Sequence, residues 1–114
     1  KPGSVTYLIN EMYKKKRGVD LDDTAGRAMQ GFLTLADAIN RAGSTEPAKI
    51  QAALRATDLK PDQLMMGYKG VKFDAKGNNE LAAALLIQIQ GDHYVAVWPK
   101  ETAVAPLQLP YKGW

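Results

Sequence analysis

Few residues of this sequence have the types and spacing that catalysis requires. The 114 residues include no cysteine and one histidine, His93, which follows the expected turn at Gly91-Asp92. The serines, Ser4 and Ser44, stand where helix caps are expected. The adjacent Asp22 and Asp23 could form a paired-carboxylate site, but capping of a helix explains them with fewer assumptions. The residues therefore favour a binding or structural unit, not an enzyme.

The sequence predicts no metal, no cofactor and no nucleic-acid partner. Asp74, Lys76 and Asn78 have a spacing that faintly resembles a calcium loop, but a lysine occupies a ligand position and the twelfth position lacks a glutamate. The absence of cysteine excludes a thiolate metal site and leaves the cellular compartment open. The net charge of +3 is mild, and basic residues do not alternate with aromatic ones along the strands.

Three helices are predicted, at about residues 4–17, 23–42 and 46–56. The expected N-caps are Ser4 for the first, Asp22, Asp23 or Thr24 for the second, and Ser44 or Thr45 for the third, with Gly18 and Gly43 as C-terminal stops. The second helix carries one stripe of apolar residues at helical spacing, namely Ala25, Ala28, Met29, Phe32, Leu35, Ala36, Ile39 and Ala42.

Strands are predicted at about residues 71–74, 83–90 and 93–98. The last two form a hairpin around Gly91 and Asp92, since glycine suits the first position of a two-residue loop. Pro99 cannot donate to a strand ladder and should end the last strand. The segment 58–70 is interpreted as irregular; Met65 and Met66 within it could line a pocket, although packing of the loop onto its own domain is the more common arrangement.

Length and composition indicate a single globular unit of the α/β class. With 46% hydrophobic residues, the chain can bury a core. No segment approaches the length of apolar sequence that crosses a membrane, and the start has no signal-peptide pattern. Because the sequence begins with Lys1-Pro2-Gly3, without an initiator Met, we expect a processed product or a fragment of a longer chain.

Several stretches in order resemble one protein family. "KGVKFDAKGNN", "LLIQIQGDHYVAVWPKETA" and "LQLPYKGW" together resemble the C-terminal end of bacterial ABC-transporter substrate-binding proteins of the branched-chain amino acid type. "GRAMQGFLTLADAINRAGSTEPAKIQAALRATDL" is similar to the helix pair that precedes this end, and "YLINEMYKKKRGVDLDD" to the helix before it. Each motif is modest alone, but the ordered set covers essentially the whole chain.

The resemblance implies the last third of a two-lobed type I periplasmic-binding-protein fold. Residues 1–18 would be a helix of the second lobe, and residues 19–92 a helix-helix-strand-hairpin part of the first lobe. Residues 93–114 would form the crossover and the tail that returns to the second lobe. Strands with open edges would then need the remainder of the chain or a second copy as a partner.

The function that the resemblance implies is capture of a small solute between two lobes and its delivery to the membrane permease of an ABC transporter. The protein would be periplasmic, or extracellular and membrane-tethered. The solute would be an amino acid or an aromatic or aliphatic carboxylate, and Thr24, Arg27 and Met29 are the ligand-binding residues carried over from the family. Arg27 would pair with a carboxylate and Met29 would contact an apolar group.

Two other functions stay open at this point. The same fold is reused as the ligand-sensing domain of receptors and regulators, which a transmembrane or DNA-binding segment elsewhere in the protein would indicate. The chain could instead be a dimerisation module that binds no solute. Each carried-over residue also has a purely structural interpretation. Thr24 would cap the helix, Arg27 would be an exposed charge on it, and Met29 would pack in the core.

Overall fold

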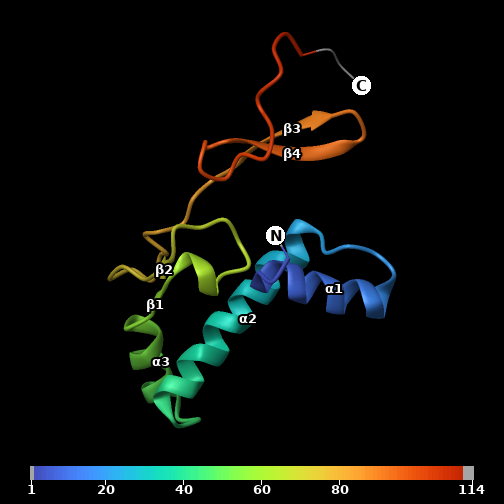
Figure 1. Cartoon of the computed structure of the whole chain (residues 1–114). Coiled ribbons are helices and arrows are strands. Elements are labelled where there is room, and N and C mark those ends of the chain that lie inside the picture. The colour runs from blue at the N-terminus through green and yellow to red at the C-terminus, as the bar shows by residue number, and fades with distance from the viewer. Residues whose placement is uncertain (1, 112–114) are drawn as a thin grey trace. The chain divides into compact units, whose positions relative to one another are not determined.

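The computed structural model describes residues 2–111, which divide into two compact units. The first unit runs to Ala82 and contains three helices, and the second begins at Ala83 and contains a β-hairpin. Figure 1 shows the first unit from blue to yellow and the second in orange and red. Helices together with strands confirm the predicted α/β class.

The three helices occur where they were predicted. They are α1 (Val5–Arg17), α2 (Asp23–Ala42) and α3 (Pro47–Arg55). The Ser4 hydroxyl accepts a hydrogen bond from the Tyr7 N–H at 3.2 Å, and an Asp22 carboxylate oxygen accepts one from the Ala25 N–H at 2.7 Å. Gly18 ends α1 with a φ of 78°, a conformation that favours glycine. These ends depend on neighbouring residues alone, so the sequence predicts them well.

The predicted cap of α3 was wrong. Glu46, not Ser44 or Thr45, is the N-cap residue, and its side chain makes no capping hydrogen bond. The Ser44 hydroxyl instead accepts a hydrogen bond from the Glu46 N–H at 3.1 Å, which makes a turn before the helix. Pro47 occupies the first turn as predicted, where its missing N–H leaves no intrahelical bond unmade.

A small antiparallel sheet joins two strands that are only two residues long, β1 (Asp58–Leu59) and β2 (Val71–Lys72). The sequence analysis missed β1, and it placed the end of β2 too late, because Phe73 makes only an isolated bridge with Asn79. Leu59 and Val71 form the core of the first unit together with Leu64. Pairs this short carry no alternating pattern that a sequence can reveal.

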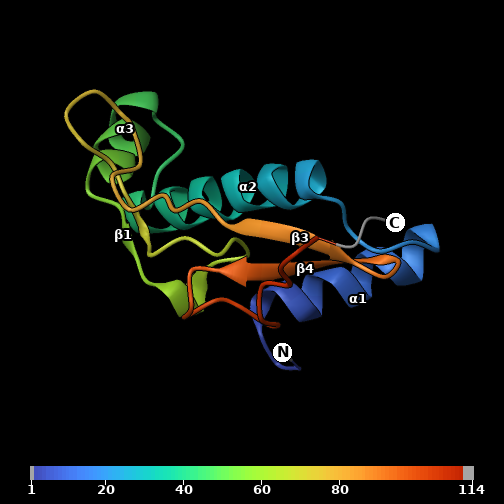
Figure 2. The same ribbon diagram turned by 90° about the horizontal axis from the view of Figure 1, so that it is seen from above.

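Helix α2 buries its polar and small face, and its apolar stripe is largely exposed. The buried residues of α2 are Gly26, Gln30, Thr34 and Ala38. Of the apolar stripe, Phe32 is 63% exposed and Leu35 is 42% exposed. Figure 2 shows the yellow-green segment after α3 running beside α2.

Gln30 explains why a polar face is buried. Its side-chain oxygen accepts a hydrogen bond from the Met65 N–H at 2.7 Å, and its amide nitrogen donates to the Thr34 hydroxyl at 3.2 Å. Both ends of the buried amide are therefore satisfied, as burial requires. Gly26 is also buried on this face, and a Cβ added there would lie 3.6 Å from the Met66 sulfur, an ordinary packing distance.

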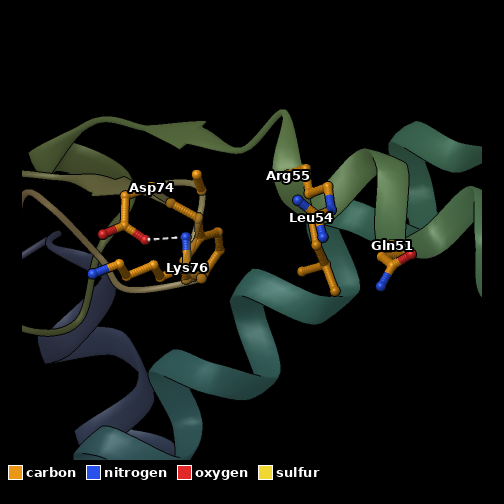
Figure 3. Close-up of a pocket in the computed structure, with 8 residues that line it drawn as sticks. Gln51, Leu54, Arg55, Asp74 and Lys76 are labelled. Carbon is orange, nitrogen blue, oxygen red and sulfur yellow. Dashed lines mark hydrogen bonds between the residues drawn. The ribbon is translucent and has the colours of Figure 1, made fainter.

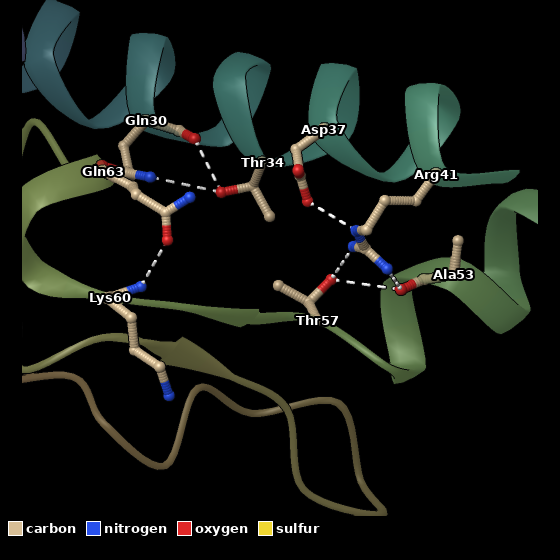
Figure 4. A network of polar contacts seen from close by, with 8 residues as sticks. All are labelled: Gln30, Thr34, Asp37, Arg41, Ala53, Thr57, Lys60 and Gln63. Atoms are coloured by element: carbon tan, nitrogen blue, oxygen red, sulfur yellow. Dashed lines mark hydrogen bonds and ion pairs between the residues drawn. The ribbon is translucent and has the colours of Figure 1, made fainter.

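A second polar group holds α2 against α3. The Arg41 guanidinium donates to the Asp37 carboxylate at 2.8 Å, to the Ala53 carbonyl at 2.8 Å and to the Thr57 hydroxyl at 2.9 Å. Thr57 is 1% exposed. Figure 4 shows both polar groups along one side of α2. Helix α3 is thus attached through directed hydrogen bonds at the C-terminal end of α2.

The second unit is a hairpin of β3 (Leu86–Gln90) and β4 (His93–Trp98). The Gln90–His93 pair encloses Gly91 and Asp92, and Gly91 has a φ of 67°, so the predicted two-residue turn is confirmed. Strand β4 has the predicted bounds, and β3 begins three residues later than the predicted 83–90. The turn also places the His93 Nε2 atom 3.0 Å from the Asp92 carboxylate, on the exposed surface.

The tail after β4 lies along the hairpin through glutamine side chains. The Gln88 side chain both donates to the Gln108 carbonyl and accepts from the Gln108 N–H, each at 2.9 Å. Gln90 donates to the Pro106 carbonyl at 2.9 Å. The tail is therefore attached to β3 by side-chain hydrogen bonds, where a further strand would be attached by backbone hydrogen bonds.

We predict that Gln30→Ala lowers the free energy of unfolding by about 1–3 kcal/mol, because it leaves the buried Met65 N–H without a partner. The measurement is the midpoint of urea unfolding. Gln51→Ala is the matched control, since Gln51 is exposed on α3 and should change stability by less than about 0.5 kcal/mol. Equal effects of the two substitutions would contradict the role given to Gln30.

Candidate functional site

A cavity of about 420 Å³ lies beside the start of α2. It is lined by Thr6, Tyr7 and Asn10 of α1, by residues 20–22 of the link between α1 and α2, by Asp23 at the start of α2, and by Met65. Its volume falls within the range of small-molecule sites, roughly 300–1,000 Å³. Three segments that are distant in the sequence therefore form one concave surface.

Asn10 fixes the link against α1. Its amide nitrogen donates to an Asp20 carboxylate oxygen at 2.8 Å, and its side-chain oxygen accepts from the Leu21 N–H at 2.8 Å. Lys14 lies 3.2 Å from the Asp20 carboxylate. On the other side of the cavity, the Thr6 hydroxyl donates to the Met65 carbonyl at 2.8 Å. These bonds hold α1, the link and the Met65 loop in one arrangement.

Carboxylates give the cavity an acidic wall. The hydrogen bond from Asn10 lowers the pKa of Asp20 most, and the hydrogen bond and charge of Lys14 lower it further. Asp22 caps α2, and Asp23 forms an ion pair with Arg27. An acidic wall next to an arginine can attract a positively charged group and a negatively charged group at neighbouring points.

Two of the three predicted ligand residues contact Asp23, which lines this cavity. Thr24 is exposed, and its hydroxyl lies 3.5 Å from a carboxylate oxygen of Asp23. Arg27 is exposed and pairs with the same carboxylate. Met29 is half-buried. None of the three lines the cavity, so their contact with a ligand stays a prediction.

The residues that do line the cavity were mostly missed. Tyr7, Asn10 and Thr6 lie on a helix that the sequence predicts, but the site depends on Met65, which is 59 residues from Thr6. Met65 was one of the two methionines considered as pocket residues, and it is 7% exposed. It packs within its own unit and also lines the cavity, so both interpretations of Met65 apply.

A second cavity, of about 370 Å³, lies on the exposed apolar stripe of α2. It is lined by Phe32, Leu35, Ala36, Ile39 and Asn40. Side chains of this kind offer packing surface but few polar contacts for a ligand. Within residues 2–111, no group of three or more His, Cys, Asp or Glu side chains could hold a metal ion, and no helix is both long and apolar enough to cross a membrane.

Comparison with known proteins identifies relatives that are named Leu/Ile/Val-binding protein homologs. No protein-family model matches the chain. The chain is 31% identical over 112 residues to the Leu/Ile/Val-binding protein homolog 7 of Brucella suis biovar 1 (strain 1330), a match that covers 96% of this chain and 27% of the relative. The homolog 8 of Brucella abortus (strain 2308) is 30% identical over 110 residues, which is 94% of this chain and 26% of that protein.

The predicted family resemblance is thereby confirmed, because the similarity to Leu/Ile/Val-binding protein homologs extends over almost the whole chain. The chain spans about a quarter of the length of these relatives. The assignment of residues 1–18, 19–92 and 93–114 to separate lobes stays a prediction.

The lowered pKa of Asp20 predicts how acid affects this site. A carboxyl group with a folded-state pKa below its ordinary value of 3.8 stabilises the fold above that value, and the contribution is lost as the pH falls through the folded-state pKa. Asp20→Asn should therefore lower the urea midpoint at neutral pH, and the difference from the parent protein should shrink as the pH falls below 3.8 and vanish once Asp20 is protonated in the folded state. Asp62→Asn is the control, because Asp62 forms no ion pair within residues 2–111. A difference for Asp20→Asn that persists in acid would contradict this role of the charge.

Proposed function

We propose that this chain is part of an extracytoplasmic solute-binding protein of an ABC importer. The protein captures a small amino acid or a related carboxylate between two lobes and delivers it to a membrane permease. The observation that carries the proposal is the similarity of nearly the entire chain to Leu/Ile/Val-binding protein homologs. The proposed location is the periplasm, or the outer surface with a membrane tether. Binding and release of the solute require no bond to be broken.

The position of the cavity beside α2 supports this proposal. With residues 1–18 in one lobe and residues 19–92 in the other, α1 and the start of α2 come from opposite lobes. The cavity that Tyr7, Asn10 and Asp23 line then lies between the lobes. A cleft between two lobes is where hinge closure can enclose a solute.

The charges beside the cavity suit an amino-acid zwitterion. Asp23 can accept hydrogen bonds from an ammonium group, and Arg27 can bind a carboxylate through two parallel N–H donors. The two side chains are four residues apart on α2 and already form an ion pair. An amino acid inserted between them replaces one ion pair with two, while Thr24 offers a hydroxyl and Met29 an apolar contact.

We predict a selective thermal shift for a chain of the relatives' length that contains this sequence. The panel is leucine, isoleucine, valine, aromatic carboxylates and short amides. A ligand that binds only the folded state stabilises it by about 2.7 kcal/mol at a hundredfold excess over its dissociation constant. A rise in melting temperature for one class of ligand names the solute, and flat curves with folded protein would contradict solute capture.

Arg27→Gln tests the site separately from the function. Loss of a charge-assisted hydrogen bond of about 1.5–3 kcal/mol should weaken binding of the solute roughly 10- to 100-fold without unfolding the protein. The measurement is titration calorimetry with the solute that the thermal screen identifies. Arg17→Gln is the matched control, because Arg17 is exposed at the end of α1 and lies outside the cavity. Undiminished binding to Arg27→Gln would exclude Arg27 from the site.

The exposed stripe of α2 indicates a partner for this chain. Phe32, Leu35 and Ile39 are 63%, 42% and 37% exposed, although apolar side chains of one helix face are normally covered. Since the relatives are almost four times as long as the match, we propose that the rest of such a chain covers this face. A second copy is the alternative occupant when residues 1–114 are isolated, and it would make the chain a dimerisation module.

Phe32→Glu distinguishes these occupants. In a chain of the relatives' length, a charge on the covered face should lower the free energy of unfolding by more than about 2 kcal/mol. Ala48→Glu, on the exposed surface of α3, should leave stability nearly unchanged. Urea unfolding measures both. Should the long chain instead form a dimer that Phe32→Glu dissociates in light scattering, with monomer stability intact, the face binds a second copy.

A further inference from the structure

A third cavity, of about 310 Å³, lies within the first unit between α3 and the turn that follows β2. Gln51, Leu54 and Arg55 of α3 line one side, and residues 73–77 line the other. Figure 3 shows Arg55 and Gln51 on α3, opposite Asp74 and Lys76 of the turn. None of its lining residues belongs to the cavity beside α2. The two surfaces are therefore separate places on the same unit.

The turn side of this cavity is held rigidly by Asp74. Its carboxylate accepts hydrogen bonds from the Lys76 N–H at 2.8 Å and from the Asn78 N–H at 2.9 Å. The Asn78 N–H is the main reason that the pKa of Asp74 lies below its ordinary value. The carboxylate thereby stabilises the wall of the cavity, and within residues 2–111 it forms no ion pair with Arg55.

The cations of this cavity have no anionic partner. Within residues 2–111, neither Arg55 nor Lys76 forms an ion pair. In Figure 3 the Lys76 side chain extends away from α3, which leaves Arg55 as the cation on the α3 side. Gln51 is four residues before Arg55, so the two side chains share one face of the helix. An arginine and an amide on one face can bind the two oxygens of a carboxylate.

Apolar groups complete the cavity. Leu54 and Phe73 are half-buried, and Phe73 packs against the Leu59, Leu64 and Val71 core. Ala75 also lines the cavity, and its small side chain is exposed. A ligand for this cavity therefore combines one anionic group with a short apolar portion. A free ammonium group gains little here, because it would lie close to Arg55 and because the Asp74 carboxylate already accepts hydrogen bonds from its own turn.

We propose that the cavity between α3 and the 73–77 turn is a second binding site, which takes a small monocarboxylate without an ammonium group. The carboxylate pairs with Arg55 and accepts a hydrogen bond from Gln51. The apolar portion contacts Leu54 and Phe73. The site is distinct from the proposed solute site, which pairs an acidic side chain with an arginine and suits a zwitterion.

Leucine and 4-methylpentanoate, which is leucine without its ammonium group, form a matched pair of probes. Titration calorimetry of the protein should show saturable binding of 4-methylpentanoate in the millimolar range or tighter. Arg55→Gln should weaken this binding at least about tenfold, a change equivalent to about 1.4 kcal/mol. Ala75→Trp should abolish it by filling the cavity. Arg17→Gln and Ala52→Trp, which change an exposed arginine and an exposed alanine outside the cavity, should leave it unchanged.

Three outcomes would overturn the proposal. They are no binding of 4-methylpentanoate, binding that Arg55→Gln and Ala75→Trp leave intact, and leucine binding that these two substitutions abolish. Leucine binding that depends on Arg27 tests the proposed solute site, and 4-methylpentanoate binding that depends on Arg55 tests the second site. Failure of one is thus distinguishable from failure of the other.

Discussion

The first unit depends on the attachment of α2 to a loop 35 residues away through the Gln30 side chain. A buried amide must satisfy its donor and its acceptor within the protein, because no solvent reaches it. Gln30 does so by bonding the Met65 backbone and Thr34. This bond determines which face of α2 is turned toward β1 and the following loop, and it places Met65 at the start of α2, where the first cavity forms.

The attachment has a consequence for the opposite face of α2. When hydrogen bonds hold the polar side of an amphipathic helix against its own chain, the apolar side must be covered by something else or remain exposed. Phe32, Leu35 and Ile39 are on that second side. The helix therefore suits a middle layer, with residues 57–71 on one side and an apolar partner on the other. Its two faces serve two neighbours, and the first unit supplies only one of them.

Features that depend on neighbouring residues were predicted from the sequence, and features that depend on residues distant in the sequence were not. Ser4, Asp22 and Gly43 act on the adjacent helix turn, so all three helices were predicted, and Gly91 likewise marked the hairpin. The apolar residues of α2 do lie along one stripe of the helix, as predicted. It could not show which face is covered, because hydrophobic periodicity describes a helix and not its neighbours. The strand β1, the end of β2 and the cavity beside α2 depend on contacts between distant residues, which a single sequence does not reveal.

Charge, more than volume, distinguishes the two polar cavities of the first unit. Their volumes of about 420 and 310 Å³ are similar, so size alone would not sort small ligands between them. Beside α2, Asp23 and Arg27 offer both signs within one helical turn. Beside α3, Arg55 is unpaired and the nearby Asp74 is bonded to its own turn. A zwitterion finds a paired acid and arginine at the first cavity, whereas a simple carboxylate needs only the arginine that the second cavity offers. Removal of one ammonium group should therefore move a ligand of unchanged shape from one surface of the protein to the other.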